Sequence, residues 1–250
     1  MVPITIFDEI EFSWCQSGIT LICEGLSLQS DKENLVYQAA KAFFSHTGID
    51  QRISIKLIKK IPIAAGLGGG SSDAACTLNA LNKIYSSPIS QDELAKIAVH
   101  LGADVPFFLE SRPCVARGIG EILEPIENWP KYWYVVITPP IEVSTSWVYR
   151  NLKLELTTID SDPIISWLKG DPSQVFMLLE NDLERVTASH FPVINTIKEC
   201  LVEAGALGAL MSGSGPSVFG VFASKDQALS AEAYLSDRNL GNIFVATDWG

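Results

Sequence analysis

A run of glycines between residues 62 and 75 constrains this chain more than any other feature. The segment reads PIAAGLGGGSSDAA, with glycine at positions 66, 68, 69 and 70. An alternating apolar and polar segment at 53–59 precedes it, and from Ser72 onward apolar residues recur with a helical period. The pattern therefore predicts a strand, a glycine loop and a helix for which Ser72 is the N-cap.

Three kinds of binding site use a glycine loop between a strand and a helix. A Walker A loop requires a lysine after its last glycine, but Ser71 and Ser72 follow Gly70. A dinucleotide fingerprint requires G-x-G-x-x-G, and Ser71 stands at the third glycine position. A loop whose amides hold phosphate at a helix N-terminus fits, because glycine permits close approach of an anion. A purely structural turn is the alternative, although four ordered glycines lose much conformational entropy.

Composition excludes several other classes of function. The chain has 18 Lys and Arg against 29 Asp and Glu, a net charge of -11, which disfavours nucleic acid as a partner. No apolar run approaches the ~18 residues that span a bilayer, and the first residues resemble no targeting peptide. The five cysteines lack C-x-x-C spacing and the three histidines lack i, i+4 partners. We therefore expect reduced thiols, a cytoplasmic protein, no membrane partner and no zinc site.

The periodicity of the remaining sequence predicts an α+β protein in two lobes, residues 1–138 and 139–250. Alternating segments at 4–13 and 18–23 predict two strands that open the chain in the manner of a hairpin. A second glycine-rich loop is expected at 212–216. Further strands are expected at 133–138, 217–223 and 242–246, and helices from Asn34 to about Phe44 and at 91–100, 172–187, 192–204 and 225–235.

Several segments, in order along the chain, resemble motifs of the GHMP kinases. The glycine loop is similar to the family signature P-x-x-x-G-L-G-S-S-A-A. The other segments are Leu101–Phe108 (LGADVPFF), Gly118–Glu121 (GIGE), Asn181–Glu184 (NDLE) and Met211–Ser217 (MSGSGPS). The resemblance runs from about residue 6 to the end of the chain. It implies an N-terminal lobe like ribosomal protein S5 domain 2 and a ferredoxin-like C-terminal lobe.

The resemblance also implies a reaction, in which the γ-phosphate of ATP moves to a small-molecule alcohol with the help of Mg²⁺. The branch of the family with the most similar motifs phosphorylates the 2-hydroxyl of a cytidine-diphosphate methylerythritol in non-mevalonate isoprenoid biosynthesis. A kinase of the homoserine or mevalonate type is an alternative, and so is a nucleotide-binding protein without catalysis.

By the same resemblance, Asp104 is the expected catalytic base, because a hydroxyl nucleophile needs a carboxylate to take its proton. From local sequence alone, Asp104 could equally cap the turn that begins at Val105. The residues expected to bind ATP are Pro62, Ala65, Gly66, Leu67, Gly68, Gly69, Gly70, Ser71 and Ser72, with Asn34 and Lys59 near the adenine. The residues expected to bind the phosphoryl acceptor are Asp104, Thr145, Tyr149, Ser212, Gly213, Ser214 and Gly215.

Each of these assignments has a structural alternative. Asn34 could be a helix cap, and Lys59 could be a solvated strand residue. The segment 212–215 could be a tight turn. Tyr149 could be an ordinary tyrosine, exposed or in the core, which is the commoner case. Asp73 is expected to be structural, in the first turn of the helix, where an acid complements the helix dipole.

Family members also carry an N-terminal strand resembling P-A-K-I-N-L and a turn resembling D-G-Y-H. Met1–Ile4 aligns with the strand that follows both, so roughly thirty family residues are absent, several times the length of a typical strand. The lysine of the first motif helps to stabilise the transferring phosphate, and loss of one such group typically costs ~10²–10³ in rate. We expect either that the protein starts upstream or that this is a shortened form that is catalytically weakened or inactive.

Overall fold

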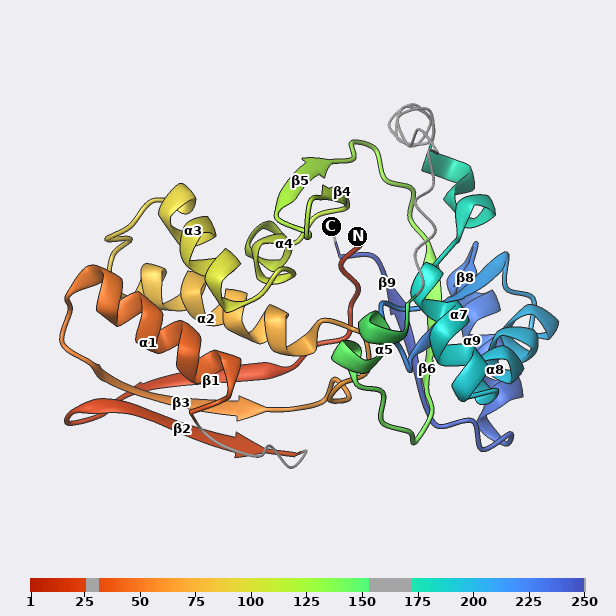
Figure 1. The fold of residues 1–250 in the computed structure, drawn as a ribbon, viewed down its shortest axis with the longest axis horizontal. Coiled ribbons are helices and arrows are strands. Elements are labelled where there is room, and N and C mark those ends of the chain that lie inside the picture. Colours follow the sequence, from red (N-terminus) through yellow and green to blue (C-terminus); the bar gives the residue numbers. More distant parts are fainter. Residues whose placement is uncertain (26–31, 153–171, 250) are drawn as a thin grey trace. The chain divides into compact units, whose positions relative to one another are not determined.

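The computed structural model describes residues 1–25, 32–152 and 172–249, which form two compact units (Figure 1). The first unit contains residues 1–63 and 68–125, and the second contains residues 64–67 and 126–249. The sequence placed a boundary at 138, whereas the units divide after Pro125. Strand β6 (Trp133–Thr138) belongs to the second unit because it pairs with β8 and β9 of that unit.

The sheet of the first unit has β3 (Arg52–Ile58) between β1 (Glu9–Trp14) and β2 (Gly18–Glu24). β1 runs antiparallel to β3, and β2 runs parallel to it. The expected hairpin of β1 with β2 is therefore wrong, since each of them pairs with β3. The parallel pair is connected through helix α1 (Leu35–Thr47), the crossover that parallel neighbours require.

Helices α1 and α2 (Gly69–Ile84) cover one face of this sheet (Figure 1). Alternate residues of β3 point toward them, and Ile53, Ile55 and Leu57 are buried. Helices α3 (Gln91–Leu101) and α4 (Val105–Glu110) pack against α2, and a small antiparallel ribbon follows, made of β4 (Cys114–Arg117) and β5 (Ile122–Pro125).

The sheet of the second unit is antiparallel, in the order β7-β8-β6-β9. Its other strands are β7 (Gly208–Met211), β8 (Val218–Phe222) and β9 (Asn242–Thr247). Helices α8 (Val193–Glu203) and α9 (Lys225–Ser236) pack on this sheet over a core that includes Ile194, Ile197 and Leu235.

The single helix expected at 172–187 is wrong. A 3₁₀ helix η1 (Pro172–Leu178) and helix α7 (Asp182–His190) occupy this region, because Asn181 adopts an extended conformation and caps α7. The sequence also missed the short helix α5 (Thr145–Asn151) and the strands β4, β5 and β7. The α+β class is confirmed.

Candidate active site

Helix α2 begins at Gly69, and no described side chain caps this end. Its N-cap is Gly68, so the expected cap at Ser72 is wrong. The amide of Ser72 already donates to the Gly68 carbonyl at 2.9 Å, which leaves the amides of Gly69, Gly70 and Ser71 before the first intrahelical hydrogen bond. These amides, at the positive end of the helix dipole, form a site suited to an anion such as phosphate.

In most other helices of the described ranges, a side chain caps the first amides. Helices α1, α3, α5, α7 and α9 each begin with a side chain that accepts a hydrogen bond from a first-turn amide. The start of α3 is a full capping box, in which Ser90 and Glu93 bond reciprocally. Helices α4 and α8 lack a side-chain cap but carry proline at their start. The open, glycine-led start of α2 therefore fits a phosphate ligand better than a structural turn.

Helix α4 brings Asp104 to the same region of the first unit. The side chain of Phe108, in α4, lies 2.8 Å from the position that a Cβ on Gly68 would take. The Ser71 hydroxyl lies 4.0 Å from the corresponding position on Gly102, two residues before Asp104. The turn that carries Asp104 therefore adjoins the start of α2.

Asp104 occupies the N-cap position of α4 but its side chain makes no capping hydrogen bond. The residue is exposed, so its carboxylate is accessible to a ligand. The alternative in which this carboxylate caps the turn is therefore not what the structure contains. An exposed carboxylate beside an anion site is suited to accept a proton from a bound hydroxyl group.

The turn at Gly118–Glu121, to which the sequence assigned no role, packs behind Asp104. The Glu121 carboxylate accepts a 2.7 Å hydrogen bond from the Ile119 amide within the turn. Gly120 has φ +120°, and a Cβ there would lie 3.2 Å from the Ala103 carbonyl oxygen. Glycine at this position thus lets the turn support the residue that precedes Asp104.

Asn34 and Lys59, expected near the adenine, both have structural partners. Asn34 caps α1, accepting a 2.9 Å hydrogen bond from the Val36 amide. The next residue, Leu35, lies 3.5 Å from the Cβ position of Gly70, so the start of α1 adjoins the start of α2. The solvated alternative for Lys59 is wrong, because its side chain is only 4% exposed.

The Lys59 ammonium contacts the carboxylates of Asp8 and Asp73, the latter at 2.8 Å. Asp73 is the fifth residue of α2, so the expected place in the first turn is wrong. Burial raises the pKa of Asp73 to about 7, although the Lys59 ammonium acts in the opposite direction. Sequence reasoning missed Asp8, which lies 51 residues from Lys59 and carries no motif.

In the second unit, Ala64–Leu67, the first part of the glycine loop, is bonded to the second glycine-rich loop. The Ser212 hydroxyl donates to the Gly66 carbonyl at 2.8 Å, and the Ser217 amide donates to the Ala65 carbonyl at 3.1 Å. Gly66 has φ +74°, and a Cβ there would lie 2.2 Å from the Ser212 carbonyl oxygen. Only glycine fits at this point of contact.

Helix α7 holds the second loop from behind. The Asn181 amide group donates to the carbonyls of Met211 (2.9 Å) and Gly213 (2.8 Å), and the Thr187 hydroxyl donates to that of Ser214 (3.1 Å). The Glu184 carboxylate accepts from the Met211 amide at 2.9 Å. The motif Asn181–Glu184 therefore fixes the loop, a role that its sequence did not reveal.

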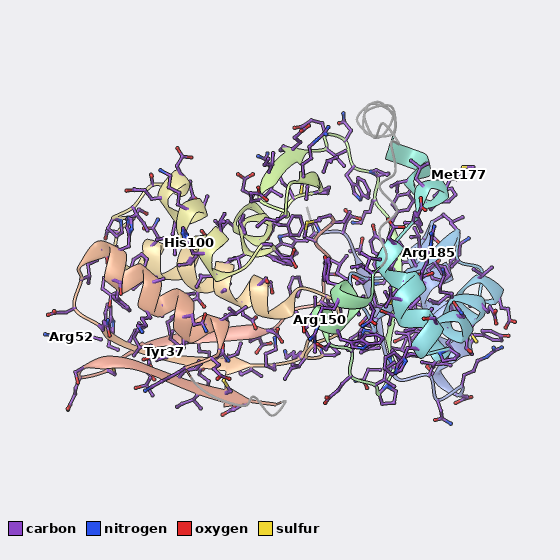
Figure 2. The ribbon with its side chains drawn as sticks, in the orientation of Figure 1. Tyr37, Arg52, His100, Arg150, Met177 and Arg185 are labelled. Atoms are coloured by element: carbon purple, nitrogen blue, oxygen red, sulfur yellow. The ribbon has the colours of Figure 1, made fainter. Side chains whose placement is uncertain are left out.

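Helix α5 contributes the remaining expected residues. The hydroxyls of Thr145 and Ser214 are hydrogen-bonded at 2.9 Å. Tyr149 lies one helical turn after Thr145 and is 60% exposed. Figure 2 shows Arg150, the next residue of α5. An exposed ring is suited to stack on a flat ligand, but a tyrosine without a binding role is also commonly exposed.

The expected site residues thus fall into two sets. The first unit holds Asn34, Lys59, Pro62, Gly68, Gly69, Gly70, Ser71, Ser72 and Asp104; the second holds Ala65, Gly66, Leu67, Thr145, Tyr149, Ser212, Gly213, Ser214 and Gly215. Within the described ranges, no group of three or more His, Cys, Asp or Glu side chains could hold a metal ion. None of the helices in those ranges has the length and apolarity needed to cross a membrane.

Comparison with known proteins agrees with this geometry. A family profile described as GHMP kinases N terminal domain matches residues 34–112, and one described as GHMP kinases C terminal matches residues 168–240. A 4-diphosphocytidyl-2-C-methyl-D-erythritol kinase from Syntrophotalea carbinolica is 45% identical, over 98% of this chain and 87% of its own length. The chain belongs to the GHMP kinase family. The family predicted from the sequence is therefore confirmed.

Other relatives and solved structures extend the comparison. The enzyme of the same name from Syntrophus aciditrophicus is also 45% identical, over 98% of this chain and 87% of its own length. A crystal structure of 4-(cytidine 5'-diphospho)-2C-methyl-D-erythritol kinase superposes with a TM-score of 0.82 at 35% identity, covering 100% of this chain and 88% of that one. A homoserine kinase from Cytophaga hutchinsonii, at 22% identity and a TM-score of 0.74, covering 96% of this chain and 86% of that one, shares the fold. The two-lobed GHMP kinase fold is confirmed.

Proposed function

We propose that this chain transfers the γ-phosphate of ATP to the 2-hydroxyl of 4-diphosphocytidyl-2-C-methyl-D-erythritol, a step of non-mevalonate isoprenoid biosynthesis. The observation that carries the proposal is the 45% identity, over nearly the whole chain, to kinases named for that substrate. The open start of α2 supports the nucleotide half of the reaction, and the exposed Asp104 supports the transfer step.

The ATP phosphates would bind the amides of Gly69, Gly70 and Ser71, with Pro62–Leu67 and Ser72 completing the loop. Amides held before the substrate arrives stabilise the charge of the transferring group without reorganisation. The start of α1 at Asn34 adjoins this loop and supports an adenine position there. Mg²⁺ would enter with ATP, because Mg²⁺ is commonly held through substrate phosphates rather than by a protein cage.

Asp104 would act as the general base toward the 2-hydroxyl of the acceptor. In the second unit, Thr145 and Ser214 present adjacent hydroxyls, and Tyr149 presents an exposed ring that suits stacking on cytosine. The loop Ser212–Gly215 would contact the same acceptor. The acceptor is a small molecule, and the net charge of -11 argues against a nucleic-acid partner.

The alternatives have less support. The homoserine kinase structure is 22% identical and the mevalonate kinases are 14–15% identical, so these structures share only the fold. The intact glycine loop and Asp104 disfavour a nucleotide-binding protein without catalysis. Cys15, Cys76, Cys114 and Cys200 are free thiols, which supports the cytoplasm as the compartment.

The proposal is tested by ADP release from the purified chain with ATP, Mg²⁺ and the cytidine-diphosphate methylerythritol, with homoserine and mevalonate as competing acceptors. We expect turnover with the first acceptor alone. Asp104→Asn should lower kcat by ~10²–10⁴, the usual contribution of a general base. Asp50→Asn is the matched control, because Asp50 is an exposed acid of the first unit whose ion pair within the described ranges is with the exposed Arg52. Turnover of homoserine or mevalonate instead, or full activity in Asp104→Asn, would refute the assignment.

A further inference from the structure

Three ionisable side chains, Asp8, Lys59 and Asp73, form a buried cluster in the first unit. Their side chains are 2%, 4% and 5% exposed. Charged groups are almost never buried so completely unless they are paired, because removing each one from water costs several kcal/mol. Buried ion pairs contribute little to stability on average, because the cost of desolvating the charges offsets their attraction. Stability alone therefore does not explain this cluster, which adjoins the glycine loop.

The cluster joins three segments that are far apart in sequence. Asp8 precedes β1, Lys59 follows β3, and Asp73 lies in α2. One oxygen of Asp8 accepts hydrogen bonds from the amides of Lys60 (2.5 Å) and Ile61 (2.9 Å), and the other contacts the Lys59 ammonium. The same ammonium binds Asp73 at 2.8 Å. The residues that enter the glycine loop are thereby tied to the helix that leaves it.

The ammonium also lies against the backbone of the anion site. A Cβ on Gly69 would be 3.3 Å from the Lys59 nitrogen and 3.0 Å from the Ile61 side chain. Gly69 is the first residue of α2 and supplies one of the open amides. The position of Lys59 therefore bears directly on where that amide lies.

We propose that Asp8, Lys59 and Asp73 are positioning residues that clamp the two ends of the glycine loop, so that the amides of Gly69–Ser71 are held ready for nucleotide phosphates. A preorganised loop binds more tightly because its ordering cost is met on folding rather than on binding. The inference rests on the proposed function and replaces an adenine contact for Lys59, whose ammonium is already bound by two carboxylates.

A neighbouring pair of the same chemistry provides a matched control. Lys60 contacts Glu9, one residue along the chain from Lys59 and Asp8, but both of their side chains are more than half exposed. Exposed pairs contribute little, so removing this one should leave the loop unchanged. Lys60→Met and Lys59→Met thus remove the same ammonium group at adjacent positions. Of the two, Lys59→Met is expected to release the clamp on the glycine loop.

The experiment measures binding of a non-hydrolysable ATP analogue by calorimetry, and steady-state kinetics with both substrates, for the wild-type chain, Lys59→Met, Asp8→Asn and Lys60→Met. We expect Lys59→Met and Asp8→Asn to weaken analogue binding and to raise KM for ATP by roughly tenfold or more. This is the effect expected from losing one charge-assisted hydrogen bond. The KM for the acceptor should stay within about twofold, as should every constant of Lys60→Met. General loss of structure would not produce this division between the two substrates.

Thermal unfolding shows which variants fold. If Lys59→Met does not fold, Asp8→Asn decides, because it removes the charge but keeps an oxygen that can accept from the Lys60 and Ile61 amides. Unchanged analogue binding in a folded cluster variant would overturn the clamp and leave the proposed function standing. Equal rises in both KM values would likewise overturn it. If the wild-type chain shows no phosphoryl transfer and does not bind the analogue, both proposals are overturned.

Discussion

Replacing Gly66 by alanine tests the contact between the two glycine-rich loops of the second unit. The backbone of Gly66 is in the left-handed region, where a Cβ costs about 1 kcal/mol. The new Cβ would also lie 2.2 Å from the Ser212 carbonyl oxygen and 3.0 Å from that of Gly215. Both atoms are backbone, so no side-chain rotation relieves the clash, and overpacking of this kind costs about 1–3 kcal/mol.

Displacement of the loop would also break the hydrogen bond from the Ser212 hydroxyl to Gly66, which contributes about 1 kcal/mol. We therefore expect Gly66→Ala to lower the free energy of unfolding of the second unit by roughly 3–5 kcal/mol. Urea unfolding followed by tryptophan fluorescence measures this change. The same variant should raise KM for ATP, because the first part of the loop leaves its support.

Gly205→Ala is the control in the same unit. Gly205 also has positive φ (+94°), but no described atom lies within 4 Å of its Cβ position, so only the backbone strain of about 1 kcal/mol applies. Ser212→Ala removes the hydrogen bond without the clash and should cost about 1 kcal/mol. If Gly66→Ala destabilises the protein no more than Gly205→Ala, the contact between the loops is not as close as described.

Three further predictions concern other parts of the site. Burial raises the pKa of Asp73 to about 7, well above its unfolded value of 3.8. Between these two values the native state keeps a proton that the unfolded state releases. The free energy of unfolding should therefore fall as the pH rises from about 4 to 7, and level off above pH 7. Urea unfolding at pH 5 and pH 8 should show this loss, roughly 3 kcal/mol from this group, in the wild type but not in Asp73→Asn. Gly120→Ala should press on the Ala103 carbonyl and lower kcat while KM for ATP is retained, and a normal kcat would argue against support of Asp104 by this turn. Tyr149→Ala should raise KM for the acceptor by about 2–10-fold, the worth of one stacked ring, and leave ATP binding unchanged in calorimetry.

The sequence predicted what depends on local pattern. The strand before the glycine loop and the helix after it follow from the spacing of apolar residues and from the glycine run. The family motifs singled out Asp104 as the expected base, and this role stays a prediction. The N-cap of the helix was placed four residues late, at Ser72, because serine is a usual cap, whereas here Gly68 takes that position and the end stays open. The four-residue strands β4, β5 and β7 are too short to show a period.

What the sequence could not predict depends on contacts between distant residues. The alternating pattern identified β1 and β2 as strands but could not reveal that both pair with β3. Lys59 resembled a solvated strand residue because nothing near it in sequence indicates burial; its partner Asp8 lies 51 residues away. Gly66 was expected among the ATP-binding residues, and nothing near it in the sequence indicated its close contact with Ser212, 146 residues away.

Because the start of α2 is open, ligand binding there should be measurable from the thermal stability of the protein. A helix whose first amides await an anion gains stability when one arrives, so the melting temperature rises with the concentration of any compound that fits. At a hundred times its Kd, a ligand that binds only the native state adds about 2.7 kcal/mol. Nucleotides, nucleotide analogues and competing anions can therefore be ranked by thermal shift alone, before any phosphoryl acceptor has been prepared.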